Sequence, residues 1–278
     1  MRTYWNTNRG LRTLEKWEPN CWVQVTCPTQ DDIDWILIIL RIPYVKEVRS
    51  RTPYTTIPLG IILNKEVCIT VCNFETNMMI DFVSYQQKRG LGFTDSVDMV
   101  FRLFLSSAVW YLKRLKQINL LIEKAKQHLD RNVDNVDLIN LSRLQDSLTY
   151  FITSIRGNET LLSKLKFKLP VDELDADLIE DVNIEMSQAR ETTSIYANIL
   201  DSTMDTYANI INNNTSGVMK MLTSISIILM FPTLIASLLG MNLVNGMENW
   251  AWGFPVALML TVGITVAFVW YFKRKTWI

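Results

Sequence analysis

Residues 221–239 read MLTSISIILMFPTLIASLL and residues 251–272 read AWGFPVALMLTVGITVAFVWYF, and neither run contains a charged side chain. At about 1.5 Å per helical residue, each run is roughly long enough to cross a hydrocarbon core of about 30 Å. Lys220 precedes the first run, and the basic Lys273–Lys275 cluster follows the second. Because positive flanks stay on the cytoplasmic side, we predict a multi-pass membrane protein with a two-helix hairpin and both termini inside. The alternative, a buried hairpin in a soluble domain, is disfavoured because soluble core helices seldom stay uncharged over this length.

The short segment between the two runs carries a recognisable motif. Gly240, Met241 and Asn242 follow the first run directly, and Glu248 is the one charged residue between Lys220 and Lys273. With VMKMLT at 218–223, PTLIAS at 232–237 and the Lys-Arg-Lys tail, this arrangement resembles the CorA family of magnesium channels. The resemblance implies a homopentamer in the cell membrane that transports Mg²⁺, with Co²⁺ and Ni²⁺ as further substrates. We expect the tripeptide to be the outer selectivity element. Glu248 either concentrates cations at the mouth or is an ordinary solvated charge of the loop.

Composition narrows the remaining function classes. The chain has 28 basic and 28 acidic residues among 278, which argues against a nucleic-acid partner because such proteins carry a basic surplus. His128 is the single histidine, so no catalytic triad can be assembled and we predict no enzyme and no cofactor, with Mg²⁺ as substrate and regulatory ligand. Cys68 and Cys72 can share a strand face, but ordinary buried thiols are favoured over a zinc site. His128 itself is expected to be solvated.

The fold class that the sequence predicts is an α+β cytoplasmic domain, followed by a long stalk helix and the transmembrane hairpin. We expect an α/β domain at 1–97, a helical arm at 98–170, a stalk at 171–217 continuous with the first span, and the hairpin with its basic tail at 218–278. In the first domain we predict β-strands at 22–26, 36–42, 55–63 and 67–71. A helix is predicted at 77–89, ending at Gly90. A helix start near Pro28 is also expected. Within the family resemblance this domain is shortened, because a helical segment expected after Trp35 is missing.

The arm and the stalk differ in charge and in pattern. Apolar residues at helical spacing predict a first arm helix, with Val100, Leu103, Phe104, Val109, Leu112, Leu115, Ile118, Leu121 and Ile122 on its buried face. A second arm helix is expected over 137–168, broken only at Gly157. The stalk is acidic, because ten carboxylates between Asp172 and Asp205 face the single basic residue Arg190.

A polar stripe follows the stalk into the first span. Steps of three and four residues connect small or polar side chains and methionines, namely Asn212, Ser216, Met219, Thr223, Ser226, Met230, Thr233 and Ser237. The same phase continues downward through Asn209, Asp205 and Asp181 to Asp177, while Val182, Met186, Ala189, Tyr196, Leu200, Tyr207 and Ile210 form a packing face. Because a polar stripe facing lipid is costly unless several copies turn it inward, the stripe predicts a homo-oligomer around a pore. The alternative is that these hydroxyls only bond back to their own helix or mediate tight packing.

The predicted mechanism is passive flow of a hydrated cation. Mg²⁺ gives up its water reluctantly, so the neutral amide of Asn242 suits outer-sphere contact. Hydroxyls of Thr233, Ser226 and Thr223 line the path, Met219, Leu222 and Met230 form a gate that closes by dewetting, and Asp205 and Asn209 receive the ion. The resemblance suggests regulation by cytoplasmic Mg²⁺, for which Asp177 and Asp181 are the candidates. The alternatives are a zinc transporter of the same superfamily, disfavoured by Met241, and a membrane-tethered coiled-coil scaffold without a pore.

Overall fold

The computed structural model describes residues 2–6, 11–16, 18, 21–26, 38–46, 52–63, 67–90, 92–129, 135–168, 175–241 and 252–277. The chain divides into two compact units, Met1–Met204 and Asp205–Ile278. Each unit is described by itself below.

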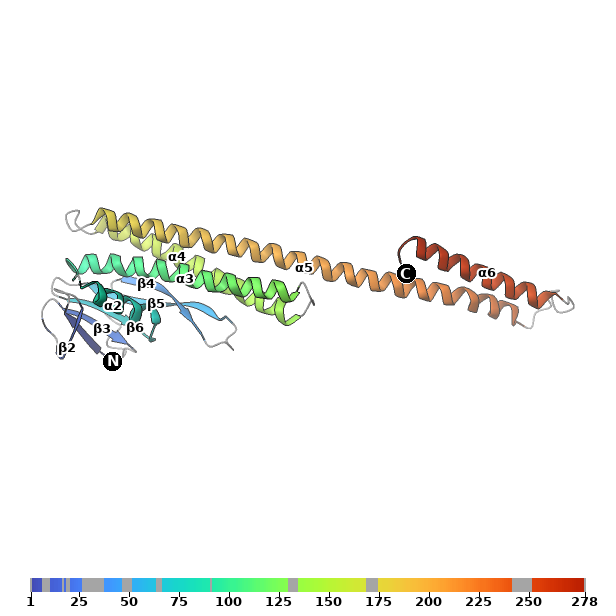
Figure 1. The fold of residues 1–278 in the computed structure, drawn as a ribbon, viewed down its shortest axis with the longest axis horizontal. Helices are drawn as coiled ribbons and strands as arrows, with labels where there is room; N and C mark the ends of the chain where they lie inside the picture. The colour runs from blue at the N-terminus through green and yellow to red at the C-terminus, as the bar shows by residue number, and fades with distance from the viewer. Residues whose placement is uncertain are drawn as a thin grey trace. The chain divides into compact units, whose positions relative to one another are not determined.

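Among the described residues, the first unit contains one six-stranded sheet (Figure 1). Its strands lie in the order β2-β1-β3-β6-β5-β4, and β3 and β6 are parallel while all other neighbours are antiparallel. The strand bounds are β1 Arg2–Asn6, β2 Arg12–Leu14, β3 Cys21–Thr26, β4 Ile38–Val45, β5 Tyr54–Leu63 and β6 Val67–Cys72.

The four strands that the sequence predicts are confirmed, with ends shifted by one to three residues. β1 and β2 were not predicted, because a polar and basic N-terminal segment carries a weak strand signal. Trp5 joins β1 to β3 through side-chain contacts. Its ring stacks on Trp22 of β3 at 6.0 Å, and its indole Nε1 donates to Gln24 at 3.3 Å. The predicted helix start near Pro28 and the segment after Trp35 lie outside the described residues.

Helix α2 (Asn77–Arg89) has the predicted bounds and recognisable caps at both ends. Thr76 is the N-cap and its hydroxyl accepts from the backbone N–H of Met79 at 3.2 Å. Gly90 ends the helix in the left-handed conformation with φ 66°, which costs glycine little because it has no Cβ. Trp22 of β3 meets Phe82 of α2 edge to face at 5.9 Å, so α2 covers the sheet at β3.

The arm consists of α3 (Ser96–Leu129) and α4 (Asn135–Lys168). Two expectations for it are wrong. Val109 and Leu121 are exposed, because the buried face between Phe104 and Leu115 passes through Ser107, Ala108 and Tyr111 instead. Gly157 does not break α4, because it is exposed and the helix tolerates one glycine at about 1 kcal/mol.

Side chains of the arm satisfy the free edge of the sheet. Arg41 lies on edge strand β4, which pairs with β5 on one side and with no described strand on the other. Instead, Asn158 of α4 accepts from the Arg41 N–H at 2.9 Å and donates to the Arg41 carbonyl at 2.7 Å, and the Tyr111 hydroxyl of α3 donates to the same carbonyl at 3.0 Å. Asn158 therefore replaces the missing neighbouring strand and fixes the arm to the sheet.

Helix α5 (Ala176–Leu239) begins in the first unit and ends in the second. It continues through Gly217 and through Pro232, which lies in the apolar part. In the second unit α5 is followed by α6 (Gly253–Arg274).

Candidate functional site

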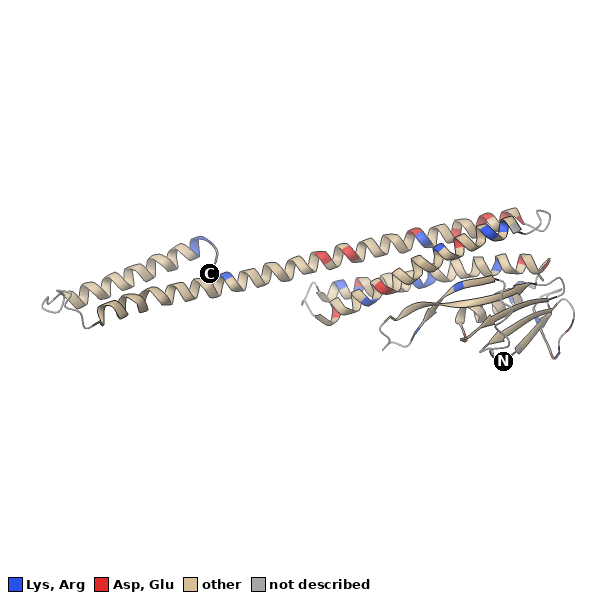
Figure 2. Ribbon diagram, turned by 180° about the vertical axis from the view of Figure 1, so that it is seen from behind, with Lys and Arg blue, Asp and Glu red and all other residues tan. Residues whose placement is uncertain are grey.

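The two apolar helices of the second unit have the properties of membrane spans. Only 6% of the most apolar window is buried in each of α5 and α6, whereas the core helix of a soluble protein would be mostly buried. Large apolar side chains face outward, among them Leu229 at 64% and Met259 at 78% exposure. The charge pattern in Figure 2 agrees, because the described residues between Lys220 and Lys273 carry no charge. The predicted two-helix hairpin accordingly has two helices that are long and apolar enough to cross a membrane.

Aromatic contacts hold the hairpin together. Phe231 of α5 stacks on Phe268 of α6 with ring centroids 4.5 Å apart, and Phe268 in turn contacts Phe272 at 6.2 Å. Ser224 is completely buried, as a small residue at a close helix approach is expected to be. Because the two helices run antiparallel from the Phe231–Phe268 contact, Lys220 and the Lys273–Lys275 cluster lie at the same end of the unit.

The predicted polar stripe is exposed at every position. This holds for Asn212, Ser216, Met219, Thr223, Ser226, Met230, Thr233 and Ser237, and for Asp205, Asn209, Asp177 and Asp181 in the same phase. Leu222, the predicted gate residue beside the stripe, is exposed too. On the predicted packing face Val182, Met186, Ala189, Leu200 and Tyr207 are buried, whereas Tyr196 is half-buried and Ile210 is exposed. One chain thus leaves the stripe without protein cover, and the role of these residues stays a prediction.

The stripe hydroxyls have a defined orientation. Ser226 Oγ donates to the Leu222 carbonyl at 2.9 Å, and Thr233 Oγ1 donates to the Leu229 carbonyl at 2.8 Å. These bonds to the preceding turn agree with the alternative that the hydroxyls bond back to their own helix. They use the hydroxyl proton and leave the oxygen lone pairs available. A hydroxyl that donates its proton still has lone pairs that accept. Both side chains therefore present acceptors rather than donors along the stripe.

The Gly-Met-Asn motif begins where α5 ends. The Gly240 N–H donates to the Ala236 carbonyl at 2.9 Å and closes the last turn after Leu239. A Cβ on Gly240 would lie 3.2 Å from the same carbonyl oxygen, which is a tight contact with backbone. Met241 is 49% exposed. Asn242 and Glu248 lie outside the described residues, so their roles stay predictions.

No cluster of three or more metal-ligating side chains exists among the described residues. Among these residues, Asp177 and Asp181 are therefore not joined by further ligands. Cys68 and Cys72 are buried and form no disulfide with a described residue. Burial raises the pKa of the Cys68 thiol to about 12, which disfavours the thiolate that binds metal. His128 is 72% exposed and lies 3.9 Å from Asp137, as the sequence predicts for a solvated histidine.

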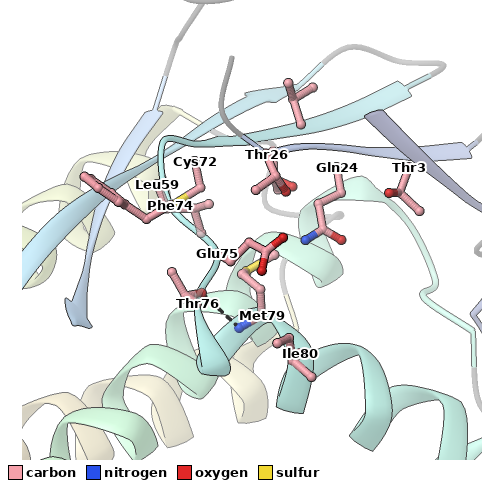
Figure 3. Close-up of a pocket in the computed structure, with 12 residues that line it drawn as sticks. Thr3, Gln24, Thr26, Leu59, Cys72, Phe74, Glu75, Thr76, Met79 and Ile80 are labelled. Carbon is pink, nitrogen blue, oxygen red and sulfur yellow. Dashed lines mark hydrogen bonds between the residues drawn. The ribbon is translucent and has the colours of Figure 1, made fainter. Parts of the chain in front are cut away.

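The first unit also contains a polar pocket that no sequence pattern predicted. It has a volume of about 220 Å³ and lies between the sheet and the start of α2 (Figure 3). The Gln24 amide and the Glu75 carboxylate point toward each other across it, with Thr3 and Thr26 beside Gln24 (Figure 3). Glu75 is the single carboxylate among its described lining residues, so these residues lack the set of oxygen ligands that holds a divalent cation.

Comparison with known proteins identifies the family. Residues 29–274 match the family model described as CorA-like Mg2+ transporter protein. The cobalt/magnesium transport protein CorA of Methanocaldococcus jannaschii is 26% identical over 260 residues, which cover 90% of this chain and 79% of that protein. The protein of the same name from Thermotoga maritima is 29% identical over 171 residues, covering 60% of this chain and 49% of the relative.

Solved structures share the fold. The complete structure of the CorA magnesium transporter from M. jannaschii superposes with a TM-score of 0.84 at 19% identity, covering 100% of this chain and 99% of that one. The cytoplasmic domain of ZntB from Vibrio parahaemolyticus gives a TM-score of 0.58 at 12% identity, covering 77% and 97%. The predicted fold class is confirmed as an α+β domain, a long helix and a second apolar helix. Since the family consists of ion transporters, the prediction of no enzyme is confirmed too, and the match over residues 29–274 shows that this chain belongs to the CorA-like Mg²⁺ transporter family.

Proposed function

We propose that this chain forms a homo-oligomeric pore, a pentamer by family resemblance, for the passive influx of hydrated Mg²⁺. The observation that carries the proposal is the polar stripe of α5, which is exposed from Asp177 to Ser237 although the surrounding helix is apolar from Met221 onward. In a bilayer such a stripe is stable when several copies turn it toward a common axis. Both termini then lie in the cytoplasm, and α5 lines the path.

The driving force is the membrane potential. Moving a single charge through 100 mV is worth about 2.3 kcal/mol, so a divalent cation gains about 4.6 kcal/mol. No energy source in the protein is needed for inward flow. Co²⁺ and Ni²⁺ are further candidate substrates, in line with the cobalt/magnesium description of the M. jannaschii relative.

Selectivity in this proposal comes from acceptors that bind the water shell of the ion. Water molecules around a cation point their hydrogens outward, and the Ser226 and Thr233 hydroxyls have already donated their own protons to α5. Their lone pairs therefore face a hydrated cation favourably and an anion unfavourably. The Asn242 amide oxygen, repeated around the axis, would act in the same way at the outer mouth without the firm hold of a carboxylate.

Gating is proposed at the two stripe methionines and at Leu222 beside the stripe. Met219, Leu222 and Met230 are 58–62% exposed in one copy, and around an axis they form an apolar constriction that closes by dewetting. Cytoplasmic Mg²⁺ would hold this closed state by bridging Asp177 or Asp181 to a neighbouring copy. Inhibition by internal Mg²⁺ that is unchanged in Asp181→Asn would remove that aspartate from the proposal.

The test is Mg²⁺ uptake into liposomes that contain the purified chain under an inside-negative potential. Asn242→Ala should abolish most of the flux, and Asn245→Ala in the same loop is the matched control that should retain it. Equal flux through wild type and Asn242→Ala, or no flux through either, would contradict the pore. Faster uptake of Zn²⁺ than of Mg²⁺ would favour the zinc branch of the superfamily instead.

A further inference from the structure

The polar pocket of the first unit lies where open α/β sheets bind their ligands. β3 and β6 are the one parallel pair among the described strands, and Thr26 and Cys72, their last paired residues, both line the pocket. Helix α2 follows β6 and contributes Met79 to the lining. Ligands of open α/β sheets bind outside the carboxyl ends of the strands. The place of the pocket in the fold is therefore that of a binding site.

Trp5 fixes the orientation of the Gln24 amide at this pocket. The Trp5 Nε1 donates to Gln24 Oε1 at 3.3 Å, and an indole N–H can only donate. The amide oxygen therefore faces Trp5, and the amide nitrogen points into the pocket toward Glu75 (Figure 3). A hydrogen-bond donor is thus held in position by the protein itself.

Glu75 supplies acceptors on the other side of the pocket. Its side chain is exposed, and Figure 3 draws no hydrogen bond between its carboxylate and the Gln24 amide. A ligand between these two groups has to donate to Glu75 and accept from Gln24. A bare cation does not suit the inward-pointing amide nitrogen, and an anion does not suit the carboxylate. The two groups together therefore select a neutral ligand with adjacent donors and acceptors.

Apolar side chains make the rest of the pocket suitable for a flat ring. Leu59 and Met79 line it and are at most 3% exposed. The Phe74 ring also lines it, is 47% exposed, and rests against Tyr44 with the ring centroids 5.3 Å apart. The volume of about 220 Å³ is below the about 300–1,000 Å³ of sites for drug-sized ligands. The pocket therefore fits one heterocycle rather than a whole nucleotide.

We propose that this pocket binds the guanine base of a nucleoside. Guanine carries two N–H donors beside a carbonyl oxygen on one edge. The two Glu75 oxygens accept from these donors, and the Gln24 amide nitrogen donates to the carbonyl. Hydrogen bonds to a carboxylate are about twice as strong as neutral ones, so Glu75 carries the specificity. Adenine has no carbonyl and offers Glu75 only its exocyclic amine, so it matches the pocket less well.

Equilibrium dialysis of the full chain in detergent against tritiated guanosine tests the binding. We expect saturable binding of one guanosine per chain. Inosine, which lacks the exocyclic amine of guanosine, should compete about tenfold more weakly, because one hydrogen bond to the carboxylate is lost. Adenosine should compete more weakly still. An absence of saturable guanosine binding, or competition by adenosine as strong as by guanosine, would overturn the proposal.

Glu75→Gln tests the role of the carboxylate. Guanosine binding should weaken about tenfold or more, and the preference for guanosine over inosine should largely disappear. Glu123→Gln makes the same charge change at an exposed position of α3 outside the pocket and should bind guanosine like wild type. Both side chains are exposed, so thermal unfolding of the two variants should agree. If Glu75→Gln binds guanosine as tightly as Glu123→Gln, the proposal fails. Neither measurement involves Mg²⁺ uptake, so this failure leaves the pore standing.

Discussion

Two helices of this chain carry rows of polar residues, and the rows have opposite surroundings. On α4, Ser147, Ser154 and Asn158 are at most 1% exposed and bond to strands β4 and β5. On α5, the stripe from Asn212 to Ser237 is exposed at every position. Both rows follow a helical period. The buried row has its partners in the same chain, whereas the described residues of one chain do not cover the exposed row.

The largest expected effect concerns the partner within the chain. Asn158→Leu removes both hydrogen bonds to the Arg41 backbone at the sheet edge. The Arg41 N–H is then left without an acceptor. We expect a loss of about 2–4 kcal/mol in the free energy of unfolding, since each buried group without a partner costs about 1–3 kcal/mol. Denaturant unfolding of the full chain in detergent measures the loss. Thr153→Ala, at an exposed position of α4, is the control, and an equal loss in both variants would show that Asn158 does not join the arm to the sheet.

A smaller effect is expected from Tyr111, which bonds to the same Arg41 carbonyl. Tyr111→Phe should cost about 0.5–1.5 kcal/mol, because Asn158 still satisfies that carbonyl. The substitution should also change the pH dependence of stability. Complete burial raises the pKa of the Tyr111 phenol above its ordinary value of 10.0, so above that pH the unfolded chain loses the proton while the folded chain keeps it.

The sign of this dependence follows from proton binding. The folded state then holds more protons than the unfolded state, and stability falls as pH rises above about 10. Unfolding at a series of alkaline pH values should give a steeper fall for wild type than for Tyr111→Phe. Parallel curves would mean that the Tyr111 phenol is accessible to water in the folded chain.

Sequence patterns located most elements but not the partners of the polar rows. The predicted helix at 77–89 and its end at Gly90 agree with α2, because these features depend on residues close together in the chain. Asn158 was missed because its role depends on the backbone of Arg41, which lies 117 residues away in the sequence and meets Asn158 only in the folded chain. Val109 was assigned to the buried face because spacing cannot show that α2 leaves this side of α3 open.

The stripe of α5 was visible in the sequence because it interrupts an apolar run. Its exposure could be anticipated from phase alone, since Val182, Met186 and Ala189 define the buried face of the same helix. The role of the stripe stays a prediction, which measurements of Mg²⁺ uptake test.

The smallest expected effect on the free energy of unfolding is at Thr233. Unlike Asn158, this residue should affect Mg²⁺ uptake rather than stability. Thr233→Val keeps the shape of the side chain but removes the hydroxyl that bonds to Leu229. Stability should change by less than about 0.5 kcal/mol, because the side chain is exposed. Mg²⁺ uptake should nevertheless fall about two- to tenfold, as the loss of one hydrogen bond of about 0.5–1.5 kcal/mol to the passing ion predicts.

The matched control is Thr215→Val, because Thr215 is also exposed on α5 and donates to Ile211 at 2.9 Å but lies off the stripe. Its uptake should equal that of wild type. If both variants lose the same fraction of uptake, the bond to the preceding turn matters rather than the acceptor on the stripe, and the hydroxyls of α5 belong with helix packing. If only Thr233→Val loses uptake while both keep their stability, the partner of the exposed row is the ion, just as the partner of the buried row is the sheet edge.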